Sequence, residues 1–404
     1  MKPGAVAATL WLAACHTGPP PPPPRPHPAA VPLPPAESLG FDRERLATVA
    51  SFVASQVDSA FPGVVVAVGR HGRVALLTAA GHYGVDDPRP VDSHTVFDLA
   101  SLTKVIGLTT ACMLLVDAGR LDLDAPVGTY LPEFRGPWKD RVTIRHLLTH
   151  ASGLPAWRPL FREARDRRGA LALVDTTPLD TVPGTRFVYS DLGAIVLTQV
   201  VERITGEPLD RFLETTVFQP LGMTATTFLP PRTWRDRIAP TENDTVFRHR
   251  MIRGEVHDEN AGRLGGVSGH AGLFSNVPDL VRFANWLLDL ERPTAPCSVL
   301  CLSPGTVEQF TRRQDLPPGS TRALGWDTPS DSGYSSAGSK LSRRSFGHTG
   351  FTGTSIWLDP ERDLFIVLLT NRVNPTRANA RILQVRARVA DLVADALVGD
   401  GRSR

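Results

Sequence analysis

The chain has 404 residues, of which 42% are hydrophobic and 21% are charged, and its formal net charge at pH 7 is +3. These values are typical of a soluble globular protein, and the length suits either two domains or one large enzyme domain with an insertion. The positive charges are spread along the chain without a basic block, so the sequence predicts no nucleic-acid partner. No apolar run reaches the roughly 20 residues that a membrane-spanning helix needs.

The first element is a targeting segment. Met1 and Lys2 form a short basic start, an apolar stretch covers residues 5–14, and the sequence Leu-Ala-Ala-Cys ends at Cys15. Residues 1–15 resemble a bacterial lipoprotein signal, so we expect an exported protein that a lipid on Cys15 anchors to a membrane, facing the periplasm or cell envelope. An ordinary cleaved signal peptide is the alternative. Nothing in the sequence indicates the oligomeric state.

A proline-rich stretch follows over residues 16–38, with unbroken prolines from Pro19 to Pro24. Proline favours the extended polyproline II conformation, which would make this stretch a semi-rigid spacer between the lipid and a folded domain. The alternative is low-complexity sequence without a function. Residues 39–404 are then expected to form one domain.

The domain begins with a predicted helix over residues 41–57, where apolar side chains recur at helical spacing. Two strands are predicted at 63–68 and 74–79, and the turn between them makes a hairpin. The middle of the chain is mostly helical by the same criteria. Helices are predicted there at residues 143–149, 191–204 and 278–290.

Near the other end of the chain, two further strands are predicted at 353–358 and 364–369, separated by a polar turn. A helix is predicted over 378–398, where apolar residues again recur at helical spacing. Strands at both ends with helices between them predict an α/β (α+β) domain whose single sheet is completed by the two chain ends. We expect an inserted, mainly helical subdomain over residues 105–320.

A Ser-x-x-Lys pair at Ser101 and Lys104 is the strongest chemical signal, and it stands directly before the apolar run 105–116. If a helix starts at Ser101, Lys104 lies one turn along on the same face. A serine hydroxyl needs a base within hydrogen-bond reach, and a buried lysine that is partly neutral can be that base. A helix N-terminus also presents a backbone N–H group to a developing oxyanion.

Composition strengthens this interpretation, because the chain uses arginine for nearly every cationic position. Its lysines are only Lys2, Lys104, Lys139 and Lys340. A lysine retained in such a chain suggests a task that arginine cannot perform, such as giving up its proton. A solvated or capping lysine is the alternative.

Two more segments have side chains suited to such a site. Tyr189 stands at the start of the helix predicted at 191–204, where a phenol can project into a cleft and shuttle a proton. A packed tyrosine whose hydroxyl is already satisfied is the alternative. The glycines of residues 346–353 would let a substrate approach the backbone and bind as an extra strand, unless this segment is only a glycine-rich turn. The Gly-x-Ser-x-Gly motif of α/β-hydrolases is absent, since residues 266–270 end in histidine.

Three cysteines remain after Cys15. Cys112 lies in the apolar run after Lys104 and is expected to be a small buried side chain. Cys297 and Cys301 are close enough to form a disulfide in an oxidising compartment, but spacing does not prove one. No zinc pattern is present, so the sequence predicts no metal site.

Three motifs, at residues 101–104, 189–191 and 348–350, resemble in order and separation those of the serine β-lactamase and D-alanyl-D-alanine peptidase family. The branch that they resemble most contains class C β-lactamases and esterases. The resemblance covers about residues 41–398. Further segments similar to the family lie at residues 146–154, 256–261, 269–275 and 369–372. The resemblance implies a penicillin-binding-protein-like fold, with an antiparallel sheet flanked by helices.

The resemblance also implies catalytic roles. Ser101 would form an acyl-enzyme, Lys104 would take the proton of Ser101, and Tyr189 would pass a proton between nucleophile, lysine and leaving group. His348 stands where many relatives have lysine. It would orient a substrate carboxylate, or act by hydrogen bonding when neutral. No metal or organic cofactor is implied.

The substrate-binding residues implied by the resemblance are Thr349, Gly350 and Phe351, with the backbone N–H groups of Ser101 and Phe351 as the oxyanion hole. The sequence departs from the family at Asp191, where the third position of the tyrosine motif is usually Asn. An amide can donate a hydrogen bond to a substrate carbonyl, whereas a carboxylate can only accept one. Asp191 is expected to hold Lys104 protonated or to position it, and to weaken β-lactam recognition.

These observations predict a serine hydrolase that cleaves an ester or amide through an acyl-enzyme. Its substrate would be a peptidoglycan D-Ala-D-Ala peptide, a β-lactam or an ester, because one such fold can host all three activities. The alternative from another class is a non-hydrolytic or slowly deacylating penicillin-binding receptor associated with the cell wall.

Overall fold

The computed structural model describes residues 33–292, 297 and 299–398. Cys15, the signal segment and most of the proline-rich linker lie outside the described residues, so their assignments stay predictions. Residues from Leu33 onward belong to one compact unit. No helix in the described part of the chain is both long and apolar enough to cross a bilayer.

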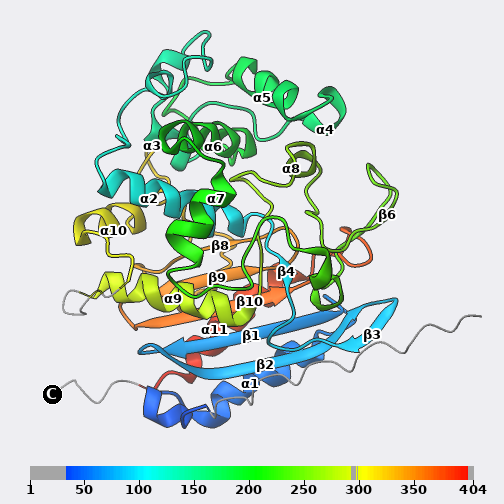
Figure 1. The fold of residues 1–404 in the computed structure, drawn as a ribbon. Coiled ribbons are helices and arrows are strands. Elements are labelled where there is room, and N and C mark those ends of the chain that lie inside the picture. Colours follow the sequence, from blue (N-terminus) through cyan, green and yellow to red (C-terminus); the bar gives the residue numbers. More distant parts are fainter. Residues whose placement is uncertain (1–32, 293–296, 298, 399–404) are drawn as a thin grey trace, which may run out of the picture. The chain divides into compact units, whose positions relative to one another are not determined.

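A six-stranded sheet in the order β3-β2-β1-β10-β9-β8 forms the centre of the unit (Figure 1). Every pairing in it is antiparallel. Its strands are β1 (Gly63–Arg70), β2 (Arg73–Gly84), β3 (Asp87–Pro90), β8 (Phe346–Thr349), β9 (Ser355–Asp359) and β10 (Leu364–Thr370). The two ends of the chain meet at its centre, where Val64 of β1 lies opposite Thr370 of β10. The predicted antiparallel sheet completed by both chain ends is therefore confirmed.

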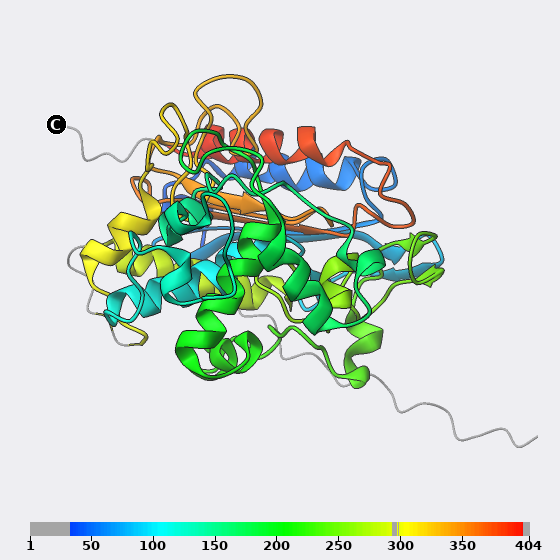
Figure 2. The same ribbon diagram turned by 90° about the horizontal axis from the view of Figure 1, so that it is seen from above.

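Strand β1 is buried on both faces, and its alternating side chains enter two different apolar clusters. Val64, Val66 and Val68 pack into one cluster with helices α1 (Arg43–Ser55) and α11 (Ile382–Ala396). Val65 and Ala67 enter the larger cluster on the opposite face, as the period of two along a strand requires. Figure 2 shows α1 and α11 side by side on one face of the sheet, in agreement with their contact.

The segment between the two halves of the sheet is mainly helical and covers the other face. Its helices are α2 (Thr110–Asp117), α3 (Ile144–Leu148), α4 (Leu160–Glu163), α5 (Arg167–Thr176), α6 (Asp191–Thr205), α7 (Leu209–Leu213), α8 (Glu259–Arg263), α9 (Val277–Glu291) and α10 (Pro304–Thr311). Helix α9 packs directly on β1 and β10. Two short ladders complete the segment, β4 (Phe97–Asp98) with β7 (Phe274–Ser275) and β5 (Asn243–Asp244) with β6 (Arg250–Met251). The expected subdomain limits at 105 and 320 stay a prediction.

Two predicted elements differ from the structure. The apolar run 105–116 is not one regular helix, because a π-helical segment, η2 (Lys104–Thr109), precedes α2. The Thr110 hydroxyl donates to the carbonyl of Val105, five residues back, which matches the wider π turn. The second difference concerns residues 346–353, which were expected to lead into a strand. The first four of them form the edge strand β8, and the glycine-rich turn follows β8 and precedes β9.

The cysteines in the described part of the chain are of two kinds, a disulfide pair and a buried free thiol. Cys297 and Cys301 form a disulfide, with their Cα atoms 5.6 Å apart. Cys112 is a free, fully buried thiol, and burial raises its pKa. Cys112 therefore behaves as a small apolar side chain of the core.

Candidate active site

Ser101 is held at the head of a helix by the turn that precedes it. Asp98, at the end of β4, is buried, and its carboxylate accepts a hydrogen bond from the backbone N–H of Ala100 at 2.8 Å. This bond supports Ala100 in the left-handed region, at φ 46°, which alanine rarely adopts. The chain therefore turns sharply at Ala100 and places Ser101 directly before the helical turn that carries Lys104.

Lys104 is a buried ammonium with three partners. Its Nζ atom donates to Ser101 Oγ at 3.0 Å and to the carbonyl of His270 at 2.9 Å, and it lies 2.7 Å from Asp191 Oδ1. Burial by itself lowers the pKa of Lys104, but the charge of Asp191, with a smaller contribution from Tyr189, more than offsets this and leaves the pKa above its ordinary value. The surroundings of Lys104 therefore favour its protonated form, and its Nζ atom lies within hydrogen-bond reach of Ser101.

Tyr189 lies above this pair, on the segment that leads into α6. Lys104 Nζ is 4.9 Å from the centre of the Tyr189 ring, and the tyrosine hydroxyl has no hydrogen-bond partner of suitable geometry among the described residues. Ser190 caps α6 by accepting from the N–H of Gly193. The phenol is thus left free to contact a substrate or leaving group.

His150 fixes the position of Tyr189, a role that the sequence did not reveal. The His150 ring centre is 4.6 Å from the Tyr189 ring centre. Its Nδ1 atom accepts from the N–H of Ser190, and its carbonyl accepts from the N–H of Val188. The one sequence signal for His150 was that the segment 146–154 is similar to the family. The contact itself could not be foreseen, because His150 and Ser190 are 40 positions apart.

The surroundings of His348 favour its neutral form. It lies on the edge strand β8, where its Nδ1–H donates to the carbonyl of Thr349 at 2.8 Å, and its Nε2 has no hydrogen-bond partner among the described residues. Burial, helped by the positive charges of Arg322 and Lys104, holds the pKa of His348 well below its ordinary value. Of the two roles expected for this residue, the geometry favours hydrogen bonding by a neutral ring over charge pairing with a carboxylate.

The turn after β8 is tied to the segment that precedes Ser101. Thr352 Oγ1 donates to the carbonyl of Asp98, and Thr354 Oγ1 donates to the carbonyl of Leu99. From the other side of the turn, Arg386 of α11 donates to the carbonyls of Gly350 and Thr354 at 2.6 and 2.9 Å. These bonds tie the backbone around Phe351 to the segment before Ser101, and both residues line one pocket, where an oxyanion could be stabilised.

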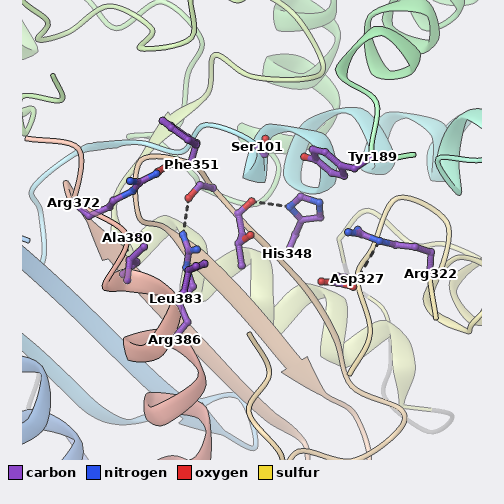
Figure 3. A pocket seen from close by; sticks show the side chains of 13 residues that line it. Ser101, Tyr189, Arg322, Asp327, His348, Phe351, Arg372, Ala380, Leu383 and Arg386 are labelled. Atoms are coloured by element: carbon purple, nitrogen blue, oxygen red, sulfur yellow. Dashed lines mark hydrogen bonds and ion pairs between the residues drawn. The ribbon is translucent and has the colours of Figure 1, made fainter. Parts of the chain in front are cut away.

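These groups surround a pocket of about 470 Å³ (Figure 3). The residues predicted for the site that line it are Ser101, Tyr189, His348, Thr349, Gly350 and Phe351. Lys104 and Asp191 are absent from its lining and lie behind Ser101, joined to it by the contacts above. No group of three or more His, Cys, Asp or Glu side chains in the described part of the chain is arranged to hold a metal ion.

The pocket is also lined by residues to which the sequence assigned no role, namely Arg322, Asp327, Arg372, Ala380, Ile382, Leu383 and Arg386. Three of them are arginines. In a chain with many arginines, the sequence does not distinguish those that line a pocket from the others. They reach the pocket from a loop, from the end of β10 and from α11, so only the folded sheet brings them together. The apolar members come from the start of α11 and from the residues just before it.

Comparison with known proteins agrees with this geometry. The Beta-lactamase family model matches residues 47–391. Curated relatives from Salmonella agona and Salmonella schwarzengrund, 31% and 32% identical over 382 residues, are named "Putative D-alanyl-D-alanine carboxypeptidase". Each of these matches spans 86% of this chain and 87% of the relative.

Solved structures show the same fold. The hydrolase EstCE1, described as having promiscuous acyltransferase activity, superposes with a TM-score of 0.69 at 25% identity, covering 87% of this chain and 99% of the other. A penicillin-binding protein homologue from Caulobacter crescentus gives 0.69 at 20% identity, over 89% of this chain and 99% of that one. A class C β-lactamase from Rhodobacter sphaeroides gives 0.66 at 24% identity, over 87% and 99%. The chain therefore belongs to the Beta-lactamase family and is a serine hydrolase of that family.

Proposed function

We propose that this protein cleaves an ester or amide bond by way of an acyl-enzyme on Ser101. The observation that carries the proposal is the 3.0 Å hydrogen bond between Lys104 Nζ and Ser101 Oγ at the edge of an open pocket. A serine becomes a useful nucleophile only with a proton acceptor at this distance, and lysine can accept a proton after losing its own.

In the proposed reaction, Ser101 Oγ bonds to the carbonyl carbon of the substrate and its proton passes to a neutral Lys104. The carbonyl oxygen becomes an oxyanion that the backbone N–H groups of Ser101 and Phe351 stabilise. The carbonyl then re-forms as the bond to the leaving oxygen or nitrogen breaks. The proton that Lys104 took from Ser101 passes to that atom through the Tyr189 hydroxyl, which has no partner of suitable geometry among the described residues. Water hydrolyses the resulting ester and restores Ser101.

The substrate we favour is a peptidoglycan peptide ending in D-Ala-D-Ala, or an ester, rather than a β-lactam. The names of the curated relatives support a carboxypeptidase substrate. The carboxylate of Asp191 argues against efficient β-lactam turnover, because it cannot donate to a substrate amide carbonyl. A receptor that is acylated and released slowly is the second candidate, and the complete Ser101, Lys104 and Tyr189 set favours turnover over it.

One experiment tests the proposal and separates the two candidates. The protein is incubated with a fluorescent penicillin and with a chromogenic short-chain ester, and the lifetime of the covalent label is read together with ester turnover. We expect labelling at Ser101, its loss in Ser101→Ala, and steady ester turnover in the wild type. Labelling of Ser101→Ala at the wild-type rate would refute the assignment, and a stable label without turnover would identify the receptor.

We also propose that a lipid on Cys15 anchors the protein to a membrane, with the proline-rich residues 16–38 as a stalk. The support is the sequence Leu-Ala-Ala-Cys after an apolar stretch, followed by the run of prolines. The mass of the mature N-terminus from the native host tests this idea, with Cys15→Ser as the control. A mature wild-type N-terminus without diacylglyceryl would rule it out.

A further inference from the structure

Arg322 stands at the boundary between the pocket of Ser101 and a second cavity. The second cavity, of about 440 Å³, is lined by Phe187, Ser330 and the loop of residues 317–321. Both cavities are lined by Arg322 and Asp327, so this pair lies where they adjoin. Figure 3 shows the two side chains from the side of the Ser101 pocket. A substrate group near Ser101 and a substrate group in the second cavity can therefore both reach the same guanidinium.

The guanidinium of Arg322 is held in place but only partly used. Its side chain is 14% exposed, and its central carbon lies 5.3 Å from the ring centre of Phe187 and 5.6 Å from that of Tyr189. The Nη1 atom is buried without a hydrogen-bond partner among the described residues. A buried charged donor left unpaired is costly, which points to a partner that arrives with the substrate.

Asp327 only partly satisfies Arg322. Its Oδ1 lies 3.7 Å from Arg322 Nε, beyond normal hydrogen-bond length, and its side chain is 31% exposed. The same Oδ1 accepts a hydrogen bond from the backbone N–H of Thr328. The pair is therefore a loose contact, in which a substrate anion could compete with Asp327 for the guanidinium.

The other positive groups of the pocket are less available. Arg372 donates through Nε to the carbonyl of Phe351 and through Nη1 to two further carbonyls. Arg386 has an unpartnered Nε, but its Nη2 is fixed by the carbonyls of Gly350 and Thr354. The lowered pKa of His348 favours its neutral form, and Lys104, which is outside the pocket lining, is paired with Asp191.

We propose that Arg322 is a binding site for a carboxylate on the substrate, and that Asp327 is a built-in competitor which weakens this binding. The inference rests on the proposed hydrolase function and deepens it by naming the charge of the preferred substrate. A guanidinium binds a carboxylate through parallel N–H donors, which gives orientation as well as affinity. Substrates with a carboxylate are then selected over neutral substrates of the same shape.

Two pairs of matched esters test the proposal. Mono-4-nitrophenyl glutarate and 4-nitrophenyl pentanoate differ by a carboxylate on the acyl side, whereas 3-acetoxybenzoate and 3-acetoxybenzamide differ on the leaving-group side. The quantity compared is the ratio of kcat/KM for the acidic ester to kcat/KM for its neutral partner. Because each ratio is taken within one variant, a general loss of activity cancels.

In Arg322→Gln we expect this ratio to fall by about 10- to 100-fold in at least one pair, the size of a lost charge-assisted hydrogen bond. The pair that responds shows on which side the carboxylate lies. Arg322→Lys should give an intermediate ratio, and Asp327→Asn should raise it. Arg343→Gln, which removes an arginine whose side chain is 78% exposed, should leave the ratio unchanged. Ratios within twofold of wild type in both pairs for Arg322→Gln would overturn the proposal.

A binding measurement separates this inference from the hydrolase function. If the wild type cleaves none of the four esters, ester cleavage is lost from the proposed function, and the ratios are replaced by a measurement that needs no turnover. Binding of 3-hydroxybenzoate, followed by ligand-observed NMR, then decides the carboxylate site without turnover. Binding that is weakened in Arg322→Gln and strengthened in Asp327→Asn supports the site, and binding that is equal in all three proteins refutes it.

Discussion

Asp191 Oδ1 lies 2.7 Å from Lys104 Nζ, so the lysine that touches Ser101 is paired with a carboxylate. The pair has a counterpart on the surface, where Lys340 contacts Asp395 and both side chains are more than 40% exposed. The surface pair is screened by water, whereas the Lys104 side chain is only 4% exposed. The same two residue types thus form a weak contact at the surface and a strong contact in the interior. The buried contact favours the positive charge on Lys104, the expected base.

Asp191→Asn should move the acid limb of the kcat/KM profile for ester cleavage to lower pH. Removing the carboxylate lowers the pKa of Lys104, so its neutral form is present at lower pH, and a single neighbouring charge is worth about 1–3 pH units. The rate of β-lactam acylation should also rise relative to ester cleavage, because an amide can donate to the substrate carbonyl. Asp395→Asn is the matched control and should change neither quantity. An unchanged limb, or a shift to higher pH, would contradict the role given to Asp191.

Gly350→Ala should abolish most activity by displacing the turn that carries Phe351. A Cβ atom at this position would lie 2.2 Å from the carbonyl oxygen of Leu99 and 2.2 Å from Thr354 Oγ1. We expect kcat/KM for esters to fall about 100-fold or more, as for loss of an oxyanion-hole donor. Gly305→Ala, in α10, is the control, because its Cβ meets no atom and should leave activity intact. Wild-type kcat/KM in Gly350→Ala would show that the turn tolerates movement.

The protein should lose stability as the pH falls below the ordinary histidine range. Burial and nearby positive charges hold the pKa values of His150 and His348 well below 6.5, so both are neutral when folded. The unfolded chain takes up protons on them below about pH 6.5, so acid favours unfolding. His348→Gln should flatten the fall of Tm from about pH 7.5 to about pH 5, because one of the two groups is removed. The exposed His249 offers the control His249→Asn, which should keep the wild-type slope. Equal slopes of Tm against pH in all three proteins would contradict the conclusion that His348 is buried in its neutral form.

Arg386→Met should lower kcat more than it raises KM for neutral esters. The change removes the donors to the carbonyls of Gly350 and Thr354, and so loosens the turn beside Ser101 without removing a group that touches the reacting atoms. A fall in kcat of about 10-fold or more is expected from misplacement of an oxyanion donor. Arg388→Met alters an exposed arginine of the same helix and should have no effect. Equal kinetics for the two variants would exclude a positioning role for Arg386.

The elements that the sequence predicted are those whose signal is local. The helices predicted over residues 41–57 and 191–204 depend on side chains within a few positions of one another, and both helices form. The sheet could be inferred because strands with no helix partner must pair with each other. The π segment was missed because its extra residue depends on the Thr110 hydroxyl, which apolar periodicity does not register.

The composition of the pocket was harder to predict than its nucleophile. Ser101 and Lys104 are three residues apart, so their contact follows from a helical turn, whereas Arg322 and Arg386 reach the pocket through the folded sheet. The sequence did indicate that the glycines of residues 346–353 matter, but the reason given for them was incomplete. Gly350 is needed because a side chain would collide with Leu99 and Thr354, beyond any need of a substrate to approach the backbone.

The pairing of β1 with β10 has a consequence for when the protein can first act. Val64 and Thr370 lie opposite each other, so the middle of the sheet joins segments made near the start and near the end of translation. His348, Phe351 and Arg386 all belong to the late segment. A ribosome-bound chain that already contains Ser101 and Lys104 therefore lacks one wall of the pocket. Because such distant pairing is slow to form, the nucleophile stays latent until synthesis is nearly finished.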